Sequence, residues 1–239
     1  MHNSKLSRLS TSFQWGQSSR SIRFRRRFLF IGACLVATLL LVTILSDSDT
    51  KSANAAVSKK MLSQSVCIDP GHGGDDPGAQ SGNLTEATLN LQVSFVVRQE
   101  LEAKGYPVYM TRTNNITLSH AQRAAFCNAH NASILVAIHQ NDYPYGNADY
   151  STALYYKPQD LALAAALANA AGKELGLSVT PPSYFVGGVL MHSAMPATLI
   201  ESLFITNDNE ASALTHGDRI NQEAIGIVDG IVNYFQVYK

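Results

Sequence analysis

The sequence predicts an α/β fold with a mostly parallel, twisted sheet and helices on both faces, formed by one domain over residues 65–239. Segments with the apolar pattern of strands alternate with segments of helical spacing, and such alternation is typical of a parallel sheet. The segment 134–139 (ILVAIH) is apolar almost throughout, as expected of a strand that is covered on both faces.

The individual elements follow from periodicity and from turn and capping residues. Leu89, Val93 and Leu101 have helical spacing, and Gly105 and Gly176 are expected to end two of the helices. Asn207 and Glu210 have the spacing of a capping box for a short helix. The predicted strands are 66–69, 108–112, 134–139, 152–156, 189–191 and 198–203. The predicted helices are a long one through Leu89–Leu101, then 118–129, 159–175, the short one after Asn207, and 219–235.

Charge is distributed unevenly along the chain. The formal net charge is zero, but residues 1–60 hold ten of the eighteen Lys and Arg and only two acids. Residues 61–239 therefore hold eight basic and sixteen acidic residues, a formal charge of −8. Nucleic-acid binding requires basic surface that neutralises phosphates, so nucleic acid is excluded as an expected partner.

The N-terminal part predicts membrane targeting. Residues 1–27 form a basic tail, and 28–45 (FLFIGACLVATLLLVTIL) are uncharged, long enough to reach about 27 Å as a helix, close to the hydrocarbon thickness of a bilayer. Five arginines at 20–27 predict a cytoplasmic tail, a transmembrane signal-anchor and an exported domain. The alternative is secretion after cleavage behind Ala55, because Ala53-Asn54-Ala55 has the small-x-small pattern of a signal-peptidase site.

Residues 46–64 are small and polar, which predicts a flexible tether. The exported part has two cysteines. Cys67 falls in a predicted strand and Cys127 in a predicted helix, and these apolar settings favour two buried free thiols. Because export permits disulfides, a bond between the two cysteines remains the alternative.

Polar side chains gather at one edge of the predicted sheet. In open α/β sheets the ligand site lies beyond the carboxyl ends of the strands. His72 follows the first strand, His139 ends the third, and Glu201 lies within the last. We therefore expect these three side chains to converge, although they are far apart in the sequence.

Two histidines and a glutamate predict a metal site. His72 lies in the turn 69–74 (DPGHGG), whose glycines keep side chains away from the imidazole. Glu86 opens the first long helix, with Thr85 as its expected N-cap. Two imidazoles and one carboxylate are a common catalytic Zn²⁺ set, which leaves a fourth position for water and lowers its pKa towards about 7. Each residue alone also has a structural explanation, such as an acid at a helix N-terminus for Glu86.

Glu201 is the predicted catalytic base. It lies in the apolar segment 198–204 (TLIESLF), where a carboxyl group costs several kcal/mol unless it is paired or belongs to a site. Burial should raise its pKa, as proton transfer near neutrality requires. Among the other histidines, His120, His130 and His216 are expected on the surface, and His192 is a weaker candidate for the cleft.

Five ordered segments carry a family resemblance: CIDPGHGGDDPGA, LTEATLNL, LEAKGYPVYMTRT, AIHQND and PATLIESLFITN. From about residue 66 to 235 the chain resembles the zinc-dependent N-acetylmuramoyl-L-alanine amidases, of amidase type 3. The resemblance implies that His72, Glu86 and His139 are the zinc ligands and that Glu201 is the catalytic glutamate. It also implies that Asn141 holds substrate or supports the metal, that peptidoglycan is the substrate, and that the bacterial cell envelope is the location.

The chain departs from the family pattern at three places. Ala87 stands where the family usually has a lysine, and Ser202-Leu203 replaces the usual residues after the catalytic glutamate. About ten residues, 140–150, separate His139 from the next strand, too few for the inhibitory helix of the division amidases. We therefore expect an open cleft and no obligate activator protein. The alternatives are a silent module that binds peptidoglycan or a partner amidase, and a zinc peptidase that cuts within the stem peptide.

Overall fold

The computed structural model describes Lys59 and residues 63–238, all of them within the unit Ala56–Lys239. The expected tail 1–27 and signal-anchor 28–45 lie outside the described residues, as does most of the tether 46–64. Within the described residues, every helix is too short or too polar to span a bilayer.

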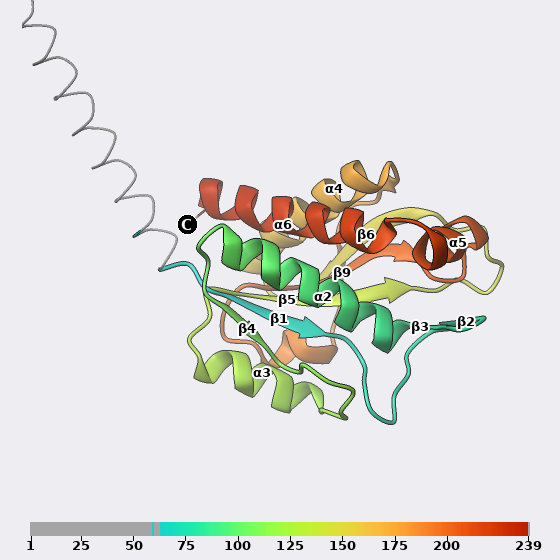
Figure 1. Cartoon of the computed structure of the whole chain (residues 1–239). Coiled ribbons are helices and arrows are strands. Elements are labelled where there is room, and N and C mark those ends of the chain that lie inside the picture. Colours follow the sequence, from blue (N-terminus) through green and yellow to red (C-terminus); the bar gives the residue numbers. More distant parts are fainter. Residues whose placement is uncertain (1–58, 60–62, 239) are drawn as a thin grey trace, which may run out of the picture. The chain divides into compact units, whose positions relative to one another are not determined.

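A seven-stranded sheet forms the centre of this unit (Figure 1), with the strand order β4-β1-β5-β9-β6-β7 and with β8 also paired to β6. The neighbours β4 (Val108–Met110), β1 (Val66–Pro70), β5 (Ile134–Asn141) and β9 (Ala197–Phe204) run parallel. β6 (Tyr150–Tyr155) is antiparallel to β9, while β7 (Ser178–Val179) and β8 (Ser183–Tyr184) run parallel to β6. The predicted mostly parallel sheet is confirmed.

Helices cover both faces of the sheet, as predicted. One core cluster joins β1 and β5 to α2 (Glu86–Ala103), α4 (Leu161–Leu175) and α6 (Arg219–Tyr238). A second cluster on the other face joins them to α3 (His120–Ala129) and the 3₁₀ helix η2 (Gly188–His192). Figure 1 shows α2 and α6 on one side of the strands and α3 on the other. The remaining elements are the hairpin β2 (Gln80–Ser81) and β3 (Leu84–Thr85), the 3₁₀ helix η1 (Pro158–Asp160) and α5 (Asp208–His216).

Helix α6 packs directly against the backbone of α4. A Cβ atom added at Gly226 would lie 2.7 Å from Ala171 Cα, and one added at Gly230 would lie 2.8 Å from Leu167 Cα. Real Cβ atoms do not approach carbon this closely, so both positions require glycine. The two helices are therefore in backbone contact through a pair of glycines one helical turn apart.

Two expectations for single elements are wrong. The predicted strand 189–191 lies in the 3₁₀ helix η2, where Val189 and Leu190 are buried against the α3 face. A short apolar run is compatible with either conformation, and here tertiary packing selects the helical turn. The second expectation is the capping box of Asn207 and Glu210. The short helix after Asn207 does form, and Asn207 Oδ1 accepts from the backbone N–H of Asn209 and Glu210. The Glu210 side chain, however, pairs with Arg219.

The expectation of free thiols is also wrong, because Cys67 and Cys127 form a disulfide, with their Cα atoms 5.7 Å apart. Cys67 lies in β1 and Cys127 in α3, and both belong to the core cluster between the sheet and α3. Each cysteine is in the apolar setting that the sequence indicates. The sequence does not show that α3 packs against β1 at the position where these two cysteines lie.

Candidate active site

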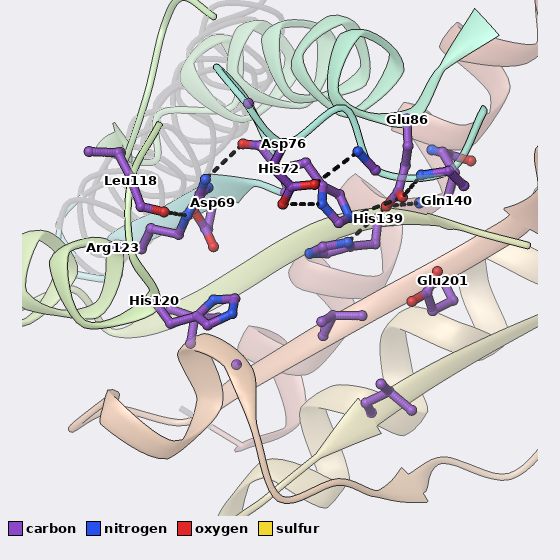
Figure 2. A pocket seen from close by; sticks show the side chains of 18 of the residues that line it. Asp69, His72, Asp76, Glu86, Leu118, His120, Arg123, His139, Gln140 and Glu201 are labelled. Atoms are coloured by element: carbon purple, nitrogen blue, oxygen red, sulfur yellow. Dashed lines mark hydrogen bonds and ion pairs between the residues drawn. The ribbon is translucent and has the colours of Figure 1, made fainter. Parts of the chain in front are cut away.

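A cavity of about 790 Å³ opens at the carboxyl edge of the parallel strands, the edge predicted to hold the site. Its size is typical of small-molecule sites. His72, Glu86, His139, Asn141 and Glu201 all line it, and Figure 2 shows four of them around the same space. The structure thus brings together every residue predicted for the site.

His72 is held in an unusual backbone conformation. Its φ of 57° lies in the left-handed region, which is uncommon for residues other than glycine. Arg123, from α3, donates to the carbonyl oxygens of Pro70 and His72 at 2.7 Å each. Arg112, after β4, donates to those of Pro70 at 2.9 Å and Gly71 at 2.8 Å. Two buried guanidinium groups therefore fix three successive carbonyls of the turn.

Asp76 sets the orientation of the His72 ring. Its Oδ2 lies 2.8 Å from His72 Nδ1, so Nδ1 can donate to this carboxylate, and Nε2 is the ring nitrogen that a metal would bind in place of a proton. The other nitrogen, His72 Nε2, faces Glu86 Oε2 at 3.0 Å. A carboxylate behind a histidine is a common way of fixing the tautomer of a metal ligand.

Glu86 lies between the two histidines. Its Oε1 is 2.8 Å from His139 Nδ1, and its Oε2 accepts from the backbone N–H of Ala79 at 2.9 Å. Thr85 is the N-cap residue of α2 as predicted, but its side chain makes no capping bond and instead donates to Thr88 Oγ1. The Glu86 side chain is therefore positioned by His139 and by the N–H of Ala79 at the cavity, and α2 begins there without a side-chain cap.

The three side chains fit a metal ion. One ligand atom from each of His72, Glu86 and His139 lies within 4.8 Å of the others, and the two imidazole rings are edge to face. Close approach of backbone to the cluster demands glycine: a Cβ at Gly71 would lie 2.3 Å from the His139 ring, and one at Gly78 2.5 Å from Glu86 Oε2. The donor set is of the kind that binds Zn²⁺ in hydrolases.

Electrostatics within this cluster favour bound positive charge. Burial disfavours the charged form of both His72 and Glu86, but their mutual contacts outweigh it. The pKa of His72 is raised to about 9 by Glu86 and Asp76 despite burial, and that of Glu86 is lowered by His139 and His72 despite burial. Glu86 is thus held as a carboxylate that attracts a cation.

Glu201 lies directly beside His139 across the β5–β9 ladder, where the two residues are register partners. Its Oε2 is buried and has no hydrogen-bond partner among the described residues. Burial, followed by the negative charge of Glu86, raises the pKa of Glu201 well above its usual value. Figure 2 shows Glu201 in the same cavity as His139, on the opposite side from Asp76. Glu201 therefore has the surroundings of a proton carrier.

Other residues at the cavity were not predicted or were placed differently. Asp76 and Arg123 were missed, although Asp76 lies only four residues after His72. His120 is exposed, as expected, but it also lines the cavity, because α3 begins at the same edge of the sheet. His192 is exposed and does not line the cavity. The connection 142–149 contains no helix, as its length predicts.

Comparisons with known proteins identify the family. The family model for N-acetylmuramoyl-L-alanine amidase matches residues 66–233. The amidase CwlM of Bacillus licheniformis is 31% identical over 184 residues, covering 73% of this chain and 70% of CwlM. LytC of Bacillus subtilis is 28% identical over 210 residues, but the chain spans only 42% of LytC.

A solved structure shows the same fold. The catalytic domain of CwlV, from Bacillus (Paenibacillus) polymyxa var. colistinus, superposes with a TM-score of 0.69 at 29% identity, covering 73% of this chain and 99% of that domain. The resemblance expected from the five sequence segments is confirmed, and the chain belongs to the N-acetylmuramoyl-L-alanine amidase family.

Proposed function

We propose that this chain hydrolyses peptidoglycan at the amide bond between N-acetylmuramic acid and the L-alanine of the stem peptide. One observation carries the proposal: His72, Glu86 and His139 place their ligand atoms within 4.8 Å of one another, and Glu201 is the register partner of His139. Family membership supports the choice of bond, since the relatives CwlM and LytC are named for this activity.

We infer that His72, Glu86 and His139 hold Zn²⁺. Two imidazoles and a carboxylate at one cavity edge are the chemistry that Zn²⁺ prefers. When bound, the ion supplies a Lewis acid that polarises the scissile carbonyl and lowers the pKa of a water molecule. Asp76 fixes the tautomer of His72 from behind, through the 2.8 Å contact with Nδ1.

Glu201 carries the proton in this mechanism. Its Oε2, which has no hydrogen-bond partner among the described residues, accepts the proton of the attacking water, and burial raises the pKa of this carboxyl group in the direction that proton transfer near neutrality requires. It then delivers the proton to the nitrogen of the departing L-alanine. Asn141 lines the cavity, and its Oδ1 accepts from Asp142 N–H at 2.9 Å, which leaves its amide Nδ2 as the group to donate to the substrate.

The decisive experiment compares metal content and turnover in matched variants. We expect about one Zn²⁺ per chain in the wild type, and loss of metal and activity with His139→Ala or with a chelator, because one of three ligands is removed. Glu201→Gln should keep the metal and lose about 10²–10⁴ in rate. His192→Ala, exposed and outside the cavity, is the control and should change neither. Full metal occupancy in His139→Ala would show that the ligands are wrongly assigned.

Mass analysis of digested peptidoglycan identifies the bond. Free stem peptides that begin with L-alanine, together with intact glycan strands, are the expected products. Fragments cut between amino acids would identify a peptidase instead, and an undigested polymer that retains the protein would identify a binding module.

Location and control are part of the same proposal. We expect the domain in the cell envelope, anchored to the membrane by residues 28–45 or released after Ala55. The cavity has no helix above it in the connection 142–149, so the chain from Ala56 should digest peptidoglycan without an added protein. CwlD of Clostridioides difficile, 23% identical, has been solved in complex with the GerS lipoprotein. An inert but folded and zinc-loaded fragment that such a partner activates would contradict our expectation.

A further inference from the structure

A second buried glutamate lies behind the proposed zinc centre. Glu223, near the start of α6, has no exposed surface, and it forms no ion pair with any described residue. Burial raises its pKa to about 7, and the contact with Gln140 opposes that rise. Burying a carboxyl group without a cation is costly, so its partners deserve an explanation.

The partner of Glu223 is the residue next to a proposed metal ligand. Gln140 Nε2 donates to both carboxyl oxygens of Glu223, at 2.8 Å and 3.0 Å. Gln140 directly follows His139 in β5, so the two side chains point to opposite faces of the sheet. His139 thus faces the cavity while Gln140 reaches α6.

The backbone of Gln140 also contacts the cluster. Its N–H donates to Glu86 Oε1 at 3.2 Å, the same oxygen that lies 2.8 Å from His139 Nδ1. Asn90 Nδ2 donates to this oxygen at 3.2 Å as well. One carboxylate oxygen of the proposed ligand Glu86 is therefore oriented partly by Gln140.

The sheet alone does not fix this position. The register between β5 and β9 shifts between His139 and Asn141, so the ladder is irregular where Gln140 lies. The extra residue belongs to β9, which advances three residues from Glu201 to Phe204 while β5 advances two, so the ladder opposite Gln140 is locally disrupted. The side-chain contact with Glu223 supplies a restraint at the point where the sheet provides less.

We propose that Glu223 and Gln140 are positioning residues of the zinc centre. The carboxyl–amide pair fixes Gln140 opposite the bulge, so that its N–H stays on Glu86 Oε1 and Glu86 stays aligned with His139. This inference rests on the proposed function of that cluster. Neither side chain touches the reacting atoms; both act through Glu86.

Three variants separate this role from simple core packing. Glu223→Gln keeps a hydrogen-bonding partner for Gln140, and Glu223→Leu removes it. The double variant Gln140→Leu, Glu223→Leu replaces both members of the pair by apolar groups, which is often neutral for stability because neither member is left without the other. All three are compared in the full chain by Zn²⁺ affinity of the metal-free protein, in competition with a chelating dye, and by kcat and KM.

We expect Glu223→Gln to bind Zn²⁺ as the wild type does. Glu223→Leu should bind it about 10–100-fold more weakly, the usual effect of losing a group that orients a ligand, with kcat lowered and KM nearly unchanged. The double variant should unfold at a urea concentration near that of the wild type yet keep the weakened Zn²⁺ affinity. If Glu223→Leu does not fold, the Zn²⁺ affinity of the double variant tests the positioning role.

Glu210 offers a matched control, since it is also buried and contacts α6 through Arg219. Glu210→Gln should lower the free energy of unfolding without changing Zn²⁺ affinity. Wild-type affinity in Glu223→Leu, or in the double variant, overturns the positioning role alone. A wild-type chain that binds no Zn²⁺ overturns the proposed function and this inference together.

Discussion

Two glutamates near the cavity differ in what surrounds their oxygens. Glu201 has an oxygen at the cavity without a hydrogen-bond partner among the described residues, as a group that exchanges protons requires. Glu223 shares both oxygens with Gln140 and lies away from the cavity. These surroundings are the reason why we propose proton transfer for Glu201 and orientation for Glu223.

The raised pKa of Glu223 predicts a pH-dependent stability. The folded chain keeps this proton up to about pH 7, whereas the unfolded chain loses it near pH 4.5. The unfolded state then binds fewer protons between these values, so the contribution of Glu223 to stability falls as the pH rises through this window, by about 3 kcal/mol. Glu223→Gln removes the effect, and urea unfolding of both proteins with chelator present at pH 5 and pH 8 measures it. A difference between the two proteins that is the same at both pH values would contradict the raised pKa.

Sequence reasoning reached the residues whose chemistry is visible in their local setting. His72 lies among glycines and Glu201 lies within an apolar strand, so each is conspicuous in the sequence. Glu223 is the fifth residue of the long amphipathic helix α6, close to its N-terminus, where an acid is ordinarily exposed. Its burial depends on how α6 crosses the end of β5, and no local pattern contains that information.

At the scale of elements, the contact between α4 and α6 fixes where Glu223 lies. Gly226 and Gly230 follow Glu223 along α6, and both bring the helix to the backbone of α4. Backbone atoms cannot rotate away as side chains do, so a methyl group at these positions must separate the helices.

Gly230→Ala should therefore destabilise the fold. Alanine favours the helix by about 1 kcal/mol, but overpacking against Leu167 Cα costs about 1–3 kcal/mol, and we expect a net loss. Gly226→Ala, whose added Cβ would lie 2.7 Å from Ala171 Cα, is the companion variant and should lose stability in the same way. Urea unfolding compares both variants with the wild type. A more stable Gly230→Ala protein would show that the helices separate without cost.

The type of each long periodic element, helix or strand, could be predicted from the sequence. The short segment 189–191 is the exception. The helices and the parallel strands carry apolar spacings over many residues, and these patterns predict their type. Residues 189–191 form a run of only three, and Gly188 directly before them, with a φ of 59°, starts a helical turn instead of a strand. Such short segments take their conformation from the surface against which they pack, here α3.

For the whole molecule, the disulfide between Cys67 and Cys127 links strand β1 to α3 across 60 residues. Closing a loop of this size restricts the unfolded chain, with an expected stabilisation of about 4 kcal/mol in the chain-entropy account. Replacing both cysteines by alanine should lower the free energy of unfolding by about this amount. Urea titrations of the variant and of the oxidised wild type test it, and equal midpoints would mean that the bond does not form in the isolated protein.

The orientation of the chain in the membrane can be tested separately. The arginines at 20–27 predict that residue 1 stays in the cytoplasm and that the domain is exported. A reporter fused after Lys239 should be active only if it is of the type that functions outside the cytoplasm. A cytoplasmic reporter active there would contradict both the location and the access to peptidoglycan.

The pairing of His139 with Glu201 in the β5–β9 ladder has a consequence for insertions and deletions. One residue added to β5 ahead of His139 would turn every later side chain to the opposite face, sending the imidazole towards α2 and α6. One residue added to β9 ahead of Glu201 would likewise turn the Glu201 side chain to the opposite face. The connection 142–149 lies beyond His139 and ahead of β6, so it can lengthen or shorten without moving either side chain. A change in the length of this connection therefore acts at the rim of the cavity, where it alters what reaches the site, and leaves the spacing of His139 and Glu201 unchanged.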